Sequence, residues 1–244
     1  MWLDTTHVVL VIGAIFGGFV SGLAGFGAGP VVLGFWLFVL EPRVAIPVLM
    51  LSGMIHMGLN LRLVWPDIQP RRLAPLAIGG ILGVPFGTLL LVWLSPSAVR
   101  LVVGLSLAVY AAVRLMMARD IVLDIKNPWI DIGAGSIVGI GSGLAGIPGP
   151  LITLWCGLRG WTKREQRAVF SPINAILVLC SIASVAFTGL VTWEVLTYAL
   201  WTIPTLFIGF SLGAPLYSRL SDRQFQRMVL ILLLLMGLML MASR

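Results

Sequence analysis

Six long apolar runs constrain the fold of this chain more than any other feature of its sequence. They cover residues 45–64, 73–94, 98–118, 168–189, 195–217 and 226–243. A helix of about 20 residues crosses the roughly 30 Å hydrocarbon core of a bilayer, so each run is long enough to span it. Only 10% of the residues are charged, against about 25% in a soluble domain. We therefore expect an all-α polytopic membrane protein.

A glycine-rich phrase occurs twice, as SGLAGFGAGP at 21–30 and as SGLAGIPGP at 142–150. It interrupts the segments 7–40 and 129–158, which are predicted to consist of two apolar pieces each. A piece of about 14 residues reaches only about 21 Å and falls short of crossing alone. Each segment is then one long broken span, two tilted spans, or a hairpin that returns to its own side.

The basic residues discriminate between these topologies, because Lys and Arg gather on the cytoplasmic side of membrane proteins. If each glycine segment returns, 13 of the 16 basic residues share one side and only Arg43, Arg100 and Arg244 lie on the other. If each segment crosses once, the division is seven against nine, which shows no bias. The charges favour returning segments with both termini outside. They leave open whether the hairpins are re-entrant or cross fully.

This topology makes the number of crossings in each half odd, so the two halves are inverted relative to each other, as in many secondary transporters. Ser21 matches Ser142 at an offset of 121, and Pro30 matches Pro150 at 120. The letters GVPFG at 83–87 are matched with GAPLY at 213–217. We predict two inverted membrane repeats, 1–122 and 123–244, within one integral membrane domain. Each repeat is a glycine-broken hairpin plus three transmembrane helices.

Paired helix breaks at membrane depth are the best sequence indicator of a transport site. The second piece of each hairpin begins near a proline, and its free N–H groups and helix dipole suit an anion. The candidate substrate-binding residues of the two phrases are Ser21, Gly22, Gly25, Gly27, Gly29, Ser142, Gly143, Gly146 and Gly149. The alternative for single glycines is close helix packing, since Gly18–Gly22 and Gly139–Gly143 have small-xxx-small spacing.

Four polar residues within the apolar runs complete the candidate site: His56, Asn60, Ser171 and Asn174. Polar groups at this depth usually face the protein interior, where they bind ligands or bond between helices. All nine acidic residues lie at segment ends or in loops. Coupling through a buried carboxylate is therefore disfavoured, and His56 is the candidate if protons are coupled.

The duplicated phrase, the chain length and the two-half layout resemble the sulfite exporter TauE/SafE family of membrane anion transporters. Its members commonly show a G-x-G-G-G run, which GFGAG (25–29) and GIPGP (146–150) match in part. Gly25, Gly27 and Gly29 carry over onto that run in the first half, with Ala28 departing from it, and Gly146 and Gly149 in the second. The resemblance implies export of sulfite, organosulfonates or related small anions.

Other functions fit the sequence less well. An embedded enzyme needs a nucleophile with a base, a metal set or a carboxylate pair, and the only histidines are the distant His7 and His56. We expect no enzyme activity, cofactor, metal site or nucleic-acid partner. A non-transporting subunit and a homo-oligomer both stay open. The basic run 159–167 is expected to anchor topology and contact anionic lipid headgroups, or to steer anions.

Overall fold

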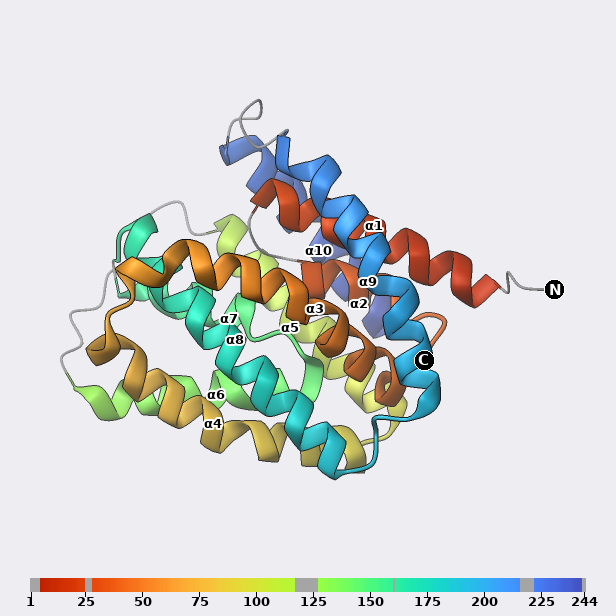
Figure 1. Cartoon of the computed structure of the whole chain (residues 1–244), viewed down its shortest axis with the longest axis horizontal. Coiled ribbons are helices and arrows are strands. Elements are labelled where there is room, and N and C mark those ends of the chain that lie inside the picture. The colour runs from red at the N-terminus through yellow and green to blue at the C-terminus, as the bar shows by residue number, and fades with distance from the viewer. Residues whose placement is uncertain (1–4, 25–27, 117–126, 160, 216–221, 243–244) are drawn as a thin grey trace. The chain divides into compact units, whose positions relative to one another are not determined.

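The computed structural model describes residues 5–24, 28–116, 127–159, 161–215 and 222–242. These residues form ten α-helices and one short 3-10 helix, with no strand among them (Figure 1). The helices are α1 (Thr5–Ala24), α2 (Ala28–Trp36), α3 (Pro42–Val64), η1 (Trp65–Asp67), α4 (Pro70–Trp93), α5 (Pro96–Met116), α6 (Pro128–Ala145), α7 (Gly149–Leu158), α8 (Lys163–Phe187), α9 (Trp193–Gly213) and α10 (Asp222–Ala242). The prediction of an all-α protein is confirmed for the described residues.

Five helices of the described part are long and apolar enough to cross a bilayer: α1, α4, α5, α8 and α9. Four of them coincide with the predicted runs 73–94, 98–118, 168–189 and 195–217. The runs 45–64 and 226–243 fall within α3 and α10, where the described residues give the shorter apolar stretches Pro42–Met54 and Leu233–Ala242. These spans support an integral membrane protein.

The glycine phrases divide their segments unequally, and this corrects the prediction that each piece is too short to cross. α1 has 20 residues and α6 has 18, whereas α2 has nine and α7 has ten. At about 1.5 Å per residue, α1 reaches about 30 Å and α7 only about 15 Å. The letters SGLA of each phrase are helical, and the glycines four residues apart in α1 and α6 pack against the backbone of a neighbouring helix.

The chain forms two compact units, each built from segments that are distant in the sequence. The first unit contains residues 1–52, 94–116 and 190–244, and the second contains 53–93 and 117–189. Both units therefore take helices from both predicted repeats. The repeats 1–122 and 123–244 stay a prediction.

In the first unit α1 packs along α9 and α2, while α10 packs against α5 and α2 (Figure 1). Glycines form the α1–α9 contact on both sides, and a Cβ on any of them would overlap a carbonyl oxygen of the partner helix. The overlaps join Gly18 to Leu206, Gly22 to Phe210, Gly209 to Ile15 and Gly213 to Phe19. Backbones this close leave no room for side chains, as in small-residue contacts between membrane helices.

In the second unit α4 packs along α6 and α8, and α7 covers α6 and α8. The α4–α6 contact is again made by glycines against carbonyl oxygens. The overlaps join Gly139 to Gly80, Gly143 to Val84, Gly83 to Ser136 and Gly87 to Ile140. An apolar core of Leu76, Val84, Val138, Ile152, Cys156, Val169, Ile173 and Leu177 lies between these helices.

The two glycine contacts correspond residue by residue. The offset between α1 and α6 is 121 (Gly18 to Gly139), and the offset between α4 and α9 is 126 (Gly80 to Leu206). GVPFG at 83–87 is thus matched with GFSLG at 209–213, which corrects the predicted match with GAPLY. Sequence similarity gave the wrong match because the correspondence depends on which glycines contact a carbonyl oxygen of the partner helix, and this is visible only in the structure.

Candidate functional site

The second glycine phrase contains a fully described helix break. α6 ends at Ala145, and Gly146 follows with φ 67° and ψ 15°, a left-handed conformation that glycine adopts without strain. The Gly146 N–H donates to the Ser142 carbonyl at 2.7 Å and so closes the helix end. Pro148 then caps α7, which begins at Gly149. The break is thus built from a glycine that turns the chain and prolines that cannot continue the first helix.

Three backbone N–H groups at this break find no acceptor in the part of the chain that the structure describes. Pro148 and Pro150 carry no N–H, and the first backbone bond into α7 runs from the Ile152 N–H to the Pro148 carbonyl at 3.2 Å. The N–H groups of Ile147, Gly149 and Leu151 have no acceptor among the described residues. Unpaired donors at a helix N-terminus, where the dipole is positive, favour a negatively charged ligand.

Gly149 differs from the packed glycines of the same unit. A Cβ at Gly149 would lie 3.4 Å from Cε2 of Phe170, which is an ordinary van der Waals distance. At Gly143, by contrast, a Cβ would overlap the Val84 carbonyl oxygen. Packing therefore accounts for the glycine at 143 but not for the one at 149.

The hydroxyls near the break lie on α6 and α8. Ser142 and Ser181 are both 0% exposed, and their oxygens are 2.9 Å apart. Ser171 is buried and Asn174 is half-buried on α8. Ser171, Asn174 and Ser181 stand at i, i+3 and i+10, which places them along one face of the helix. The sequence interpretation missed Ser181, although this spacing pointed to it.

The first glycine phrase is described only in part. Gly25 and Gly27 lie outside the described residues. Ser21 is buried within α1, and Gly22 packs against the Phe210 carbonyl of α9. Gly29 is the second residue of α2, and the buried Pro30 is its third. The binding roles of these residues stay a prediction.

His56 and Asn60 belong to the helical backbone of α3, and their side chains lie outside the described part of the structure. The residues that the structure gathers at one break are thus Ser142, Gly143, Gly146 and Gly149. No group of three or more potential metal ligands occurs among the described residues.

A buried carboxylate joins α6 to α7 farther from the break. Asp131, only 8% exposed, accepts the indole N–H of Trp155 at 3.0 Å and an N–H of Arg159 at 3.2 Å. In the first unit the indole N–H of Trp36 donates to the Leu10 carbonyl at 3.1 Å. Position 10 corresponds to 131 at the offset of 121. Both units therefore fasten the short helix to the long one through a tryptophan, and the second adds an ion pair.

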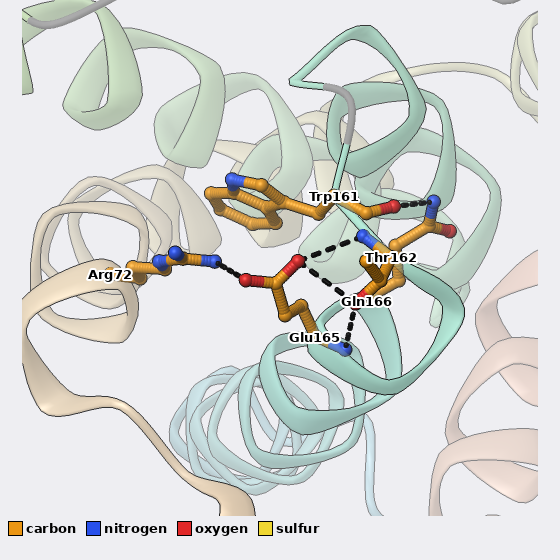
Figure 2. A network of polar contacts seen from close by, with 5 residues as sticks. All are labelled: Arg72, Trp161, Thr162, Glu165 and Gln166. Carbon is orange, nitrogen blue, oxygen red and sulfur yellow. Dashed lines mark hydrogen bonds and ion pairs between the residues drawn. The ribbon is translucent and has the colours of Figure 1, made fainter.

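A polar network surrounds the start of α8 (Figure 2). Arg72 of α4 donates to Glu165 at 2.7 Å, and its guanidinium lies 5.4 Å from the centre of the Trp161 ring. Glu165 and Thr162 form a reciprocal capping box at the helix start. The Thr162 N–H, followed by the Arg72 guanidinium and the Thr162 hydroxyl, lowers the pKa of the Glu165 carboxyl.

The same ring holds a second cation, since the Arg159 guanidinium lies 5.6 Å from the Trp161 centroid. Each of these arginines also has a carboxylate partner, Glu165 for Arg72 and Asp131 for Arg159. Their charges are neutralised within the second unit, which favours a structural role over anion steering for both. The side chains of Lys163, Arg164 and Arg167 lie outside the described residues.

Comparison with known proteins gives one finding. The family model described as Sulfite exporter TauE/SafE matches residues 10–240, nearly the whole chain. Neither the curated proteins nor the solved structures yield a significant match.

Proposed function

The chain belongs to the sulfite exporter TauE/SafE family, and from that premise we propose that it is a secondary transporter that exports a small anion across the cytoplasmic membrane. The family is one of membrane transporters for sulfite and related anions. Sulfite and organosulfonates are the substrates that it suggests. An inside-negative potential drives outward anion movement by about 2.3 kcal/mol per charge per 100 mV, so efflux needs no coupled carboxylate.

The observation that carries this proposal is the break between α6 and α7. Three N–H groups there lack acceptors among the described residues, and Ser142, whose buried hydroxyl pairs with that of Ser181, lies one helical turn before Gly146. Backbone amides and hydroxyls are donors to anion oxygens, and at membrane depth unpaired donors persist only where they serve a ligand or line a cavity. The first glycine phrase is the proposed counterpart in the other repeat.

The proposed mechanism is alternating access around the paired breaks. Two inverted repeats are the usual architecture for such transport, because each half can adopt the conformation of the other. The residue-by-residue correspondence of the α1–α9 and α4–α6 contacts supports a repeat. The asymmetry of basic residues supports the inversion, with the basic side in the cytoplasm and both termini outside.

Flux of sulfite, organosulfonates and thiosulfate into proteoliposomes tests the proposal. Gly149→Ala adds a methyl group at the break in a position that has room for it, and Gly133→Ala adds one where nothing lies within 4 Å. We expect flux that is reduced in the first variant and unchanged in the second. Absence of flux for every anion in the folded wild-type protein would contradict the proposal.

A further inference from the structure

Trp161 links three helices of the second unit. The Arg72 guanidinium of α4 lies 5.4 Å from the centre of its ring (Figure 2). The guanidinium of Arg159, the residue that ends α7, lies 5.6 Å from the same centre. The Trp161 N–H donates to the Cys156 carbonyl of α7 at 3.4 Å, and the Trp161 carbonyl accepts the Gln166 side chain of α8 at 2.8 Å. The end of α7 is thus joined through one residue to α4 and to the start of α8.

The two cations over this ring each have a countercharge. Arg72 pairs with Glu165 at 2.7 Å, and Arg159 pairs with Asp131 at 3.2 Å. The side chains of the first pair are 36% and 29% exposed, so water competes with it and the pair contributes little free energy. We call Trp161 with Arg72 and Arg159 the latch. Its contacts are individually weak, which allows it to open and close.

The polar contacts of α7 with other helices lie near its end, in the part of the chain that the structure describes. Trp155 and Arg159 both donate to Asp131 of α6. Nearer its start, α7 contributes Ile152 and Cys156, both 0% exposed, to the apolar core with α4, α6 and α8. These two side chains seal the core, and the polar contacts hold the helix in that position.

The corresponding part of the first unit is apolar. Leu10 stands at the position that corresponds to Asp131, and the residues after α2 read LFVL at 37–40. Leu37 and Leu40 are both buried. The end of α2 is therefore held by apolar packing, which contains no charged contact that water can replace. This difference gives the breakable fastening to α7 and not to α2.

From these contacts we propose that α7 is a gate, hinged at Gly146 and held shut by the latch. Glycine populates both signs of φ, so Gly146 can change the direction of the chain while α7 stays helical. Movement of α7 away from α6 and α8 opens the core that Ile152 and Cys156 seal. On the proposed topology the latch lies at the cytoplasmic end, where an exported anion enters. The role in transport rests on the proposed function, whereas the latch can be tested without any anion.

The native Cys156 thiol reports the position of α7, because it is 0% exposed and a thiol reagent reacts with it only when the helix moves. The purified full chain with Cys180→Ala carries Cys156 as its single cysteine. Trp161→Leu removes both ring contacts, and labelling of Cys156 by N-ethylmaleimide should become about five- to thirtyfold faster, the factor expected for two exposed cation–π contacts. Trp161→Phe keeps an aromatic ring and should restore most of the protection.

Two controls separate gate movement from general loosening. Trp129→Leu is the matched variant, because Trp129 belongs to α6 of the same unit with a side chain that is 74% exposed, and it should leave Cys156 labelling unchanged. In a Cys156→Ala chain, Cys180 of α8 should react at the same rate with and without Trp161→Leu. An unchanged Cys156 rate in Trp161→Leu, or an equal increase at Cys180, would overturn the latch.

A second variant keeps the test decisive if thermal unfolding shows that Trp161→Leu is not folded. Arg72→Gln removes one of the two ring contacts and leaves the Arg159–Asp131 pair in place. Labelling of Cys156 should then become about two- to fivefold faster, the factor for one such contact. An unchanged rate in this variant would overturn the latch as well.

Flux measurements test whether the gate serves transport. Asp131→Cys with Arg159→Cys, in a chain without the native cysteines, places two thiols where the ion pair joins α6 to α7. A short bismaleimide cross-linker should hold the gate shut and abolish sulfite flux in proteoliposomes, and the same variant before cross-linking is the control. If that control has no flux, Gly141→Cys with Leu151→Cys replaces it, because a Cβ at Gly141 lies 2.9 Å from Cδ1 of Leu151.

The outcomes distinguish this inference from the proposed function. Sulfite flux that persists after complete cross-linking would overturn the gate while leaving anion transport in place. Absence of flux for every anion in the wild-type protein would contradict the proposed function and the role of the gate in it, and the labelling of Cys156 would still decide whether the latch exists.

Discussion

Arg159 donates to Asp131 at 3.2 Å between α6 and α7, and the two side chains are only 15% and 11% exposed. The short helix that follows the break is therefore held to the long one by a largely buried ion pair. Burial makes such a pair sensitive to the loss of one partner, because the remaining charge stays out of water.

Arg159→Leu should destabilise the protein by about 3 kcal/mol, because Asp131 is left with only the Trp155 indole. The double variant Asp131→Leu, Arg159→Leu should recover part of this loss. It gives position 131 the leucine that stands at the corresponding position 10 of the first unit. Thermal unfolding in detergent measures the stability of the single and the double variant. A double variant less stable than Arg159→Leu would contradict the idea that an unpaired Asp131 causes the loss.

Glycine substitutions in the second unit should separate packing from binding. Gly143→Ala places a Cβ on the Val84 carbonyl oxygen and should destabilise the α4–α6 contact by about 1–3 kcal/mol. Gly149→Ala should leave the unfolding midpoint nearly unchanged while weakening anion stabilisation. Gly133→Ala is the matched control for both measurements. If Gly149→Ala lowered the unfolding midpoint while Gly143→Ala left it unchanged, the assignment of Gly143 to packing and of Gly149 to binding would be wrong.

The Arg72–Glu165 pair predicts a modest acid sensitivity. The folded protein holds the pKa of Glu165 below its ordinary value. The stability that Glu165 contributes to the folded protein is therefore present above its unfolded pKa and is lost as the pH falls through its folded pKa. The site is partly exposed, so the effect should be at most about 1 kcal/mol. Unfolding midpoints of wild type and Glu165→Gln should converge at acid pH, and a constant difference would exclude this origin.

The buried hydroxyls of Ser52 and Thr202, 2.7 Å apart, join α3 to α9 in the first unit. Both residues are almost fully buried, and each hydroxyl also lies within bonding distance of a carbonyl of its own helix. Thr202→Val keeps the shape and removes the hydroxyl, and it should cost about 1 kcal/mol or less because Ser52 can still donate to the Val48 carbonyl. A loss of stability several times larger, measured by thermal unfolding, would show that the Ser52–Thr202 pair stabilises the protein by more than one hydrogen bond.

The proposed topology predicts that a reporter fused after Arg244 lies outside the cytoplasm. The thirteen basic residues assigned to the other side include Arg71, Arg72 and Arg159. The Arg71→Cys variant places a thiol at an exposed position, and this thiol should react with membrane-impermeant thiol reagents only from the cytoplasmic face. Labelling from outside, or a cytoplasmic C-terminal reporter, would contradict the returning hairpins.

The sequence by itself determined the class of protein and most of its apolar helices, because crossing a bilayer sets a length and composition that can be read locally. It also showed the duplicated phrase and the positions of its glycines and prolines. The helix end at Ala145 follows from residues within one turn of it, since Gly146 and Pro148 act through their own backbone. These properties depend on neighbours in the chain.

The tertiary structure decided which glycines are packed and which are open. Gly143 and Gly149 belong to the same phrase, yet only Gly143 lies against the backbone of another helix, α4, which is more than fifty residues away in sequence. The same holds for Ser181 beside Ser142, for Asp131 beside Arg159, and for the match of 83–87 with 209–213. Each depends on the rotation of one helix against another, which is set by the sum of many weak contacts and leaves no local signature.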